Sequence, residues 1–229
     1  MVSPSRKHER ASRTFDRKRR KRIAREPMLI VCEGAETEPI YFRALRASMR
    51  LGAQIVDVRG SGDASDPLSV VRRALDLYEK RQLEGKNPYS SKDTYKRVYC
   101  LVDVDNRRTL GPALAAIEEA RKKGIPIEAV ISSPSFELWY FLHFRYSTRH
   151  WNASEDIERA LDCASMLPGY TKNQDYFRLL GPLTARAIEH ALRLEAFQDS
   201  QKGSGIPNPL SMVHRVVTPI VAMGEVEDE

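Results

Sequence analysis

The sequence predicts an α/β protein built on a parallel sheet of four strands that is flanked by helices. Short apolar segments alternate with amphipathic segments between residues 28 and 146, and each apolar segment has the length of one strand. Parallel strands need crossover helices, and a sheet covered on both faces has strands that are apolar throughout. The 229 residues, of which 41% are hydrophobic, suffice for one domain with a sizeable core.

Each element is predicted from a local pattern. The segment MLIVC is an apolar run typical of a strand buried on both faces, and Asp66 followed by Pro67 is a typical helix start. The predicted strands are 28–32, 54–58, 97–102 and 125–131, and the predicted helices are 37–52, 66–84, 111–123 and 136–146.

The chain divides into four parts by composition. Residues 27–150 hold the strand–helix alternation, whereas residues 151–222 show helical patterns and no convincing strand. We therefore expect a helical extension packed on an α/β core. A basic arm precedes this body at residues 1–26, and an acidic tail that we expect to be frayed follows it at residues 223–229.

The positive charge of the chain is concentrated in the arm. Residues 1–26 contain eleven Lys or Arg and three acids, a net charge of +8, which leaves −2 for the rest of the chain. An arm with few apolar residues is expected to be disordered and to bind a polyanion such as nucleic acid, unless it is only a solubilising terminus. The densest run of basic residues is Arg17, Lys18, Arg19, Arg20, Lys21 and Arg22.

Several classes of protein are excluded at this stage. No run approaches the roughly 20 apolar residues of a membrane span, and no apolar segment follows the basic N-terminus as in a secretory signal. Three cysteines, two of them in apolar runs, do not suggest a disulfide or zinc framework, so we expect a cytoplasmic protein. There is no phosphate-binding loop motif, so any ATP dependence would come from a partner ATPase. The oligomeric state stays open.

Acidic residues follow two of the predicted strands. Glu33 ends the first strand, and Asp103 and Asp105 follow the third. In open α/β sheets ligands bind at the carboxyl ends of the strands, and two carboxylates about 4 Å apart repel by roughly 4 kcal/mol at an effective dielectric of 20. If the two strands are neighbours, the three acids need a shared cation, for which Mg²⁺ or Mn²⁺ is suited.

This combination resembles the Toprim fold of primases, topoisomerases and OLD-type nucleases. More narrowly, the chain resembles the RloB-like family of bacterial defence proteins over about residues 28–217. The matching segments are residues 30–42 (IVCEGAETEPIYF), Asp66-Pro67, residues 102–105 (VDVD), 133–144 (SPSFELWYFLHF), 170–172 (YTK) and 208–214 (NPLSMVH).

The resemblance implies roles for these acids. Glu33 becomes the metal-proximal acid or general acid/base, and Asp103 and Asp105 become Mg²⁺ ligands. Many Toprim sequences have a second acid four residues after the first, whereas here Glu36 and Glu38 lie three and five residues on. Which of these two contributes to the site stays open.

Two further residues are candidates for the same site. Glu137 lies in an otherwise apolar segment, where it is either a further site acid or the first-turn acid of a helix. Lys172 is either a phosphate-binding residue or an exposed loop lysine. His143 and Trp139 are expected in the core.

Together these features predict an Mg²⁺-dependent nuclease of antiviral defence that acts on nucleic acid, with Glu33, Asp103, Asp105 and Glu137 as catalytic residues. One alternative enzyme is a phosphatase with Asp103 and Asp105 as its nucleophile pair, helped by Thr109. Another alternative is a non-catalytic nucleic-acid-binding or sensor subunit.

Overall fold

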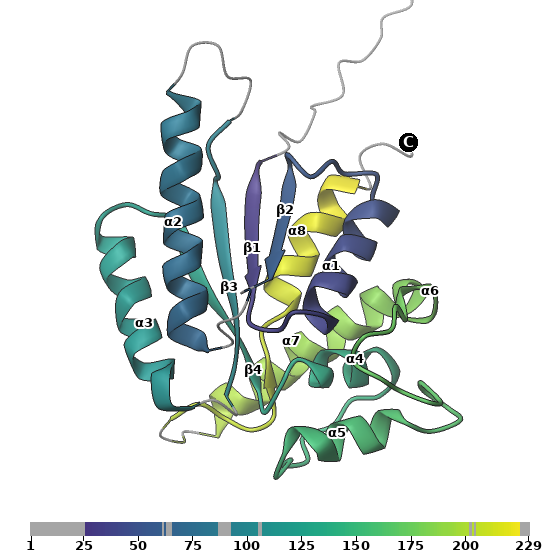
Figure 1. The fold of residues 1–229 in the computed structure, drawn as a ribbon. Coiled ribbons are helices and arrows are strands. Elements are labelled where there is room, and N and C mark those ends of the chain that lie inside the picture. The colour runs from purple at the N-terminus through teal and green to yellow at the C-terminus, as the bar shows by residue number, and fades with distance from the viewer. Residues whose placement is uncertain are drawn as a thin grey trace, which may run out of the picture.

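A computed structural model describes residues 26–60, 62, 66–86, 93–104, 107–201, 203 and 205–224 (Figure 1). Three sequence predictions lie outside these residues: the run of basic residues in the arm, the position of Asp105, and the tail beyond residue 224.

The centre of the molecule is a sheet of five strands in the order β2-β1-β3-β4-β5. Strands β1 to β4 are parallel, as predicted, whereas β5 runs antiparallel to β4 and corrects the four-stranded prediction. A strand of two residues has no periodicity from which it could be predicted. The strands are β1 (Met28–Cys32), β2 (Val56–Gly60), β3 (Arg97–Asp103), β4 (Ile127–Ser133) and β5 (Leu210–Ser211).

Helices cover both faces of the sheet (Figure 1). Helices α2 (Pro67–Gly85) and α3 (Arg107–Lys122) pack on one face. On the other face lie α1 (Thr37–Ser48), α4 (Glu137–Phe144), α7 (Thr184–Ser200) and α8 (His214–Gly224). The remaining short helices are α5 (Ser154–Leu161), α6 (Phe177–Leu180) and the 3₁₀ turn η1 (Gly181–Leu183).

Several element boundaries differ from the prediction. Helix α3 begins at Arg107 and not at residue 111, because Pro112 is accommodated inside the helix although it lacks an N–H to donate. Strand β4 continues through Ser132 and Ser133, which were predicted to form a turn, because both residues pair with β5. Strand β2 lies two residues later than predicted, and α1 and α4 end at Ser48 and Phe144.

The C-terminal helices share one hydrophobic core with the sheet. This core joins Ile30 of β1 and Trp139 of α4 to Leu194 of α7 and Ile220 of α8, and all four side chains are fully buried. Cys32, Cys100 and Cys163 are free cysteines. Across the described ranges, no helix combines the length and apolar character that crossing a membrane requires.

The topology creates a crevice between β1 and β3. From β1 the chain passes through α1 to β2 on one side, and from β3 it passes through α3 to β4 on the other side. The strand order therefore reverses between β1 and β3, and such a switch point leaves open space beyond the carboxyl ends of the two strands. Glu33 and Asp103 lie at these two ends.

Candidate functional site

A cleft of about 650 Å³ lies at this switch point, and we call it the acidic cleft. Its lining comes from the ends of β1 and β3, the start of α1, the start of α4 and the segment that precedes α6. Its charged residues are Glu33, Glu36, Glu38, Asp103, Glu137 and Lys172.

Glu33 accepts a hydrogen bond from the neighbouring strand β3. Because β1 and β3 pair in parallel, with Cys32 opposite Leu101, the residue after β1 lies beside the end of β3. The backbone N–H of Asp103 donates to Glu33 Oε2 at 3.0 Å, and the Glu33 side chain is only 8% exposed. The structure thus places Glu33 and Asp103 together, as the sequence predicted for neighbouring strands.

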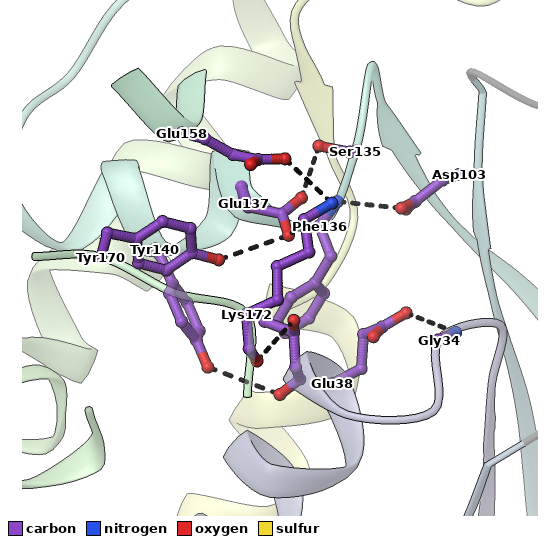
Figure 2. A network of polar contacts seen from close by, with 11 residues as sticks. Gly34, Glu38, Asp103, Ser135, Phe136, Glu137, Tyr140, Glu158, Tyr170 and Lys172 are labelled. Atoms are coloured by element: carbon purple, nitrogen blue, oxygen red, sulfur yellow. Dashed lines mark hydrogen bonds and ion pairs between the residues drawn. The ribbon is translucent and has the colours of Figure 1, made fainter. Parts of the chain in front are cut away.

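Asp103 connects β3 to the start of α4. The backbone N–H of Phe136, the residue before α4, donates to Asp103 Oδ2 at 3.2 Å (Figure 2). The N-terminal end of a helix is partly positive, so it favours a carboxylate at this position.

Glu38 occupies a buried position in the first turn of α1. The backbone N–H of Gly34 donates to Glu38 Oε1 at 2.9 Å, and a Cβ atom on Gly34 would clash with Glu38 Oε2. Residue 34 must therefore be glycine for Glu38 to lie there. Burial raises the pKa of Glu38, and the charge of Glu137 raises it further. Of the two acids that the sequence left open, Glu38 is buried among the other acids and Glu36 is exposed at the rim.

Glu137 is the first residue of α4 and is 3% exposed. Glu137 lies in the acidic cleft and also in the first turn of a helix, so it occupies both of the positions that the sequence analysis offered as alternatives. Its carboxylate accepts hydrogen bonds from Ser135 Oγ at 2.6 Å and from the Tyr170 hydroxyl at 3.3 Å (Figure 2). Burial and the charge of Glu137 raise the pKa of Tyr170, so this hydroxyl stays protonated and remains a donor.

Lys172 reaches into the acidic cleft from the C-terminal part of the chain. Its Nζ lies 2.9 Å from Glu158 Oε1 on α5 and 3.6 Å from Glu137 Oε1. The Thr37 hydroxyl donates to the Lys172 carbonyl at 3.0 Å and fixes the segment against the start of α1. Burial lowers the pKa of Lys172, but the charges of Glu137 and Glu158 outweigh it and raise the pKa above its usual value. Lys172 is therefore an ion-paired residue of the cleft.

The donor atoms of the cleft suit a hard divalent cation. Glu33 and Asp103 present carboxylate oxygens, the ligands that Mg²⁺ prefers, and Mg²⁺ is commonly held by one or two carboxylates together with water and phosphate. Within the described ranges no three His, Cys, Asp or Glu side chains form a metal-binding group. Asp105, the third predicted ligand, lies outside those ranges. The two described acids fit a site of the sparse kind that Mg²⁺ uses.

Three residues around Glu137 and Lys172 were not predicted. Ser135 and Tyr170 fall inside segments that the sequence analysis quoted, SPSFELW and YTK, and their polar side chains next to Glu137 and Lys172 were the available signal. Glu158 had none, because it is one of several acids on an amphipathic helix.

His143 and Trp139 lie in the core, as predicted. Both are fully buried, and His143 Nδ1 lies 2.9 Å from the Trp139 carbonyl while Nε2 lies 3.4 Å from the Tyr41 hydroxyl. Burial lowers the pKa of His143 to about 4, so the ring is neutral at physiological pH.

The chain matches the family model of the RloB-like proteins over residues 28–220. No curated protein and no solved structure matches the chain. The matched range includes every strand of the sheet and every charged residue of the acidic cleft, so the chain belongs to the RloB-like family.

Proposed function

We propose that the protein is an Mg²⁺-dependent phosphodiesterase that cleaves nucleic acid in prokaryotic antiviral defence, with a partner ATPase supplying any ATP dependence. The main support is the contact between the Asp103 amide and Glu33 at 3.0 Å, at the topological switch point of the sheet. The resemblance to the Toprim fold assigns this position to the catalytic acids.

The charge balance of the acidic cleft favours a cationic ligand. Glu33, Glu38 and Glu137 are each less than 9% exposed, Asp103 lies beside them, and Lys172 is the cation among the residues that line the cleft. Carboxylates that share one cleft repel each other because they carry like charges. A divalent ion would reduce this repulsion and attract a phosphate group to the same place.

The described residues can divide the chemistry as follows. Asp103, with Asp105, would hold Mg²⁺ next to Glu33, and the ion when bound would polarise the scissile phosphate and lower the pKa of a water molecule. Glu33 would accept the proton of the attacking water. Lys172 would contact a non-bridging phosphate oxygen, since its side chain is half-exposed at the edge of the cleft.

The test compares two isosteric variants with a third from the same cleft. We expect Glu33→Gln and Asp103→Asn to reduce Mg²⁺-dependent cleavage of nucleic acid by about a thousandfold, the order expected for loss of a metal ligand or a proton acceptor. Glu36→Gln is the matched control, because this acid lines the cleft but is exposed, and it should retain activity within about threefold. Turnover retained by Glu33→Gln or Asp103→Asn with an unchanged melting temperature would overturn the proposal.

A non-catalytic binding or sensor subunit is the second candidate function. It is favoured by the ion pairs of Lys172, which give Glu137 and Glu158 a counter-charge from within the protein. This candidate predicts no cleavage with Mg²⁺ or Mn²⁺, by the purified protein alone or with its partner. It also predicts binding of nucleic acid that EDTA does not change.

A further inference from the structure

A group of arginines lies at the opposite end of α4 from the acidic cleft. Helix α4 begins with Glu137 in the cleft and ends after eight residues at Phe144, a length of about 12 Å. The residues that follow include two exposed arginines, and α7 contributes a third. We call the group of Arg145, Arg149, Arg193, Tyr146 and Trp151 the arginine surface.

Two of the arginines lie on aromatic rings. The guanidinium carbon of Arg149 is 4.5 Å from the centre of the Trp151 ring, and that of Arg193 is 4.0 Å from the centre of the Tyr146 ring. Arg145 and Arg149 border a groove of about 240 Å³ whose floor includes Trp151.

The anchoring of α7 brings Arg193 to this surface. His190 Nδ1 lies 2.7 Å from the carbonyl of Leu142, near the end of α4, and holds the two helices together there. Arg193 lies about one turn further along α7, so it reaches the segment that follows α4. The arginine surface therefore combines parts of the chain almost fifty residues apart.

The positive charge of this surface is not neutralised within the protein. In the part of the chain that the structure describes, Arg145, Arg149 and Arg193 form no ion pair with a carboxylate, whereas Arg59, Arg159 and Arg215 each do. All three unneutralised arginines are exposed, and residues 144–152 contain no acid. The chain after residue 26 has a net charge of −2, so this surface differs in sign from the body that contains it.

We propose that the arginine surface binds a single strand of nucleic acid that is also the substrate of the acidic cleft. The inference rests on the proposed function, for which it names the substrate class. A guanidinium group held on an aromatic ring offers its outer face to a nucleobase and its N–H groups to phosphates. In a duplex the bases are stacked on each other, so only an unpaired strand can use both contacts.

The experiment measures binding by the full chain without divalent ions. Fluorescence anisotropy in EDTA would compare a labelled 12-nucleotide poly(U) RNA, the matching poly(dT) and a 12-base-pair duplex. We expect Arg149→Ala with Arg193→Ala to weaken binding of both single strands about tenfold, and to reduce the slope of log K against log salt by about 1.4. Binding of the duplex should change by less than about threefold.

The matched control is Arg72→Ala with Arg73→Ala, which removes two exposed arginines from α2 on the other face of the sheet. Because the basic arm contributes equally in both variants, the difference between them reports the arginine surface alone. Equal affinity of the two variants for single strands would overturn the inference, and so would an equal loss for duplex and single strands.

A second variant covers the case in which the alanine variant does not fold. Arg149→Lys with Arg193→Lys keeps both charges and loses the guanidinium groups, so we expect about threefold weaker binding with an unchanged salt slope. Affinity equal to that of the unchanged protein would contradict the stacking role. A chain that cleaves nothing but binds through this surface would overturn only the proposed function.

Discussion

Two acids at opposite ends of the sheet are equally buried and differently bound. Asp57 near the start of β2 and Glu33 at the end of β1 are each 8% exposed. Asp57 accepts hydrogen bonds from Arg59 Nε and Nη2, at 2.7 and 3.1 Å, and from the Tyr95 hydroxyl at 2.5 Å. Glu33 accepts from a backbone amide, that of Asp103, and lies in a cleft with four further acids and Lys172.

The comparison shows two uses of a buried carboxylate. A charge that is matched by an arginine joins parts of the fold and has no capacity left for a ligand. Acids that outnumber the nearby cations leave a net negative charge, which can attract a ligand from outside the protein. The first arrangement indicates a structural role and the second a functional one.

The largest expected effect is on stability for Asp57 and on cleavage for Glu33. Asp57→Asn should lower the free energy of unfolding by about 2 kcal/mol, because Arg59 and Tyr95 lose a charged partner, and should leave cleavage unchanged within twofold. Glu33→Gln should reduce cleavage by about a thousandfold and shift the melting temperature by less than about 2 °C. Thermal unfolding and a cleavage assay on both variants would check this, and a cleavage defect in Asp57→Asn would remove the distinction.

A smaller effect is expected from two glycine variants. Gly34→Ala should cost about 1 kcal/mol of unfolding free energy and reduce cleavage at least tenfold, because the new Cβ would move the Glu38 carboxylate away from the Gly34 amide.

Gly111→Ala is the control for this substitution. Nothing lies within 4 Å of a Cβ there, and the residue is inside α3, so this change should stabilise the protein by about 0.5–1 kcal/mol. Denaturant unfolding would measure both values. Equal stability of the two variants would show that Glu38 has no required position.

The smallest effect concerns lysine ion pairs. Lys172→Met should lower the free energy of unfolding at pH 7 by about 1 kcal/mol, whereas Lys122→Met, which breaks an exposed pair with Glu119 at 2.7 Å, should change it by less than about 0.5 kcal/mol.

The effect of Lys172→Met should also depend on pH. Burial already raises the pKa of Glu38, and Lys172 opposes that rise, so removing Lys172 destabilises the ionised form and leaves the protonated form unaffected. The loss should therefore be complete at pH 7 and shrink as the pH falls toward 4. A loss that is independent of pH would show that Lys172 stabilises by packing alone.

Much of the fold could be predicted because its signals are local. The apolar run of β1 and the Asp66 cap of α2, whose side chain accepts from the amides of Leu68 and Ser69, depend only on neighbouring residues. Strand β5 could not be predicted, since its two residues become a strand only by pairing with β4.

The candidate site was predictable to the same extent. Glu33 and Asp103 end strands, so topology alone brings them together. The segment with Lys172 is held by a hydrogen bond from the Thr37 hydroxyl to the Lys172 carbonyl, between residues 135 positions apart. A local sequence pattern cannot predict a contact between residues so far apart in the chain. The choice of Glu38 over Glu36 depended on how α1 turns after Gly34, which the spacing of the acids did not determine.

Three carboxylates of the acidic cleft are oriented by the polypeptide backbone, through the N–H groups of Gly34, Asp103 and Phe136. Alanine substitution leaves every backbone N–H donor in place. An alanine scan would therefore show the effect of losing each acid, but not the effect of losing the amide that orients it. Replacing one of these backbone amides with an ester by semisynthesis would remove a single N–H donor, so it would measure how much that donor contributes to orienting the carboxylate. Sequence drift around the cleft can therefore alter many side chains while the geometry of its acids persists.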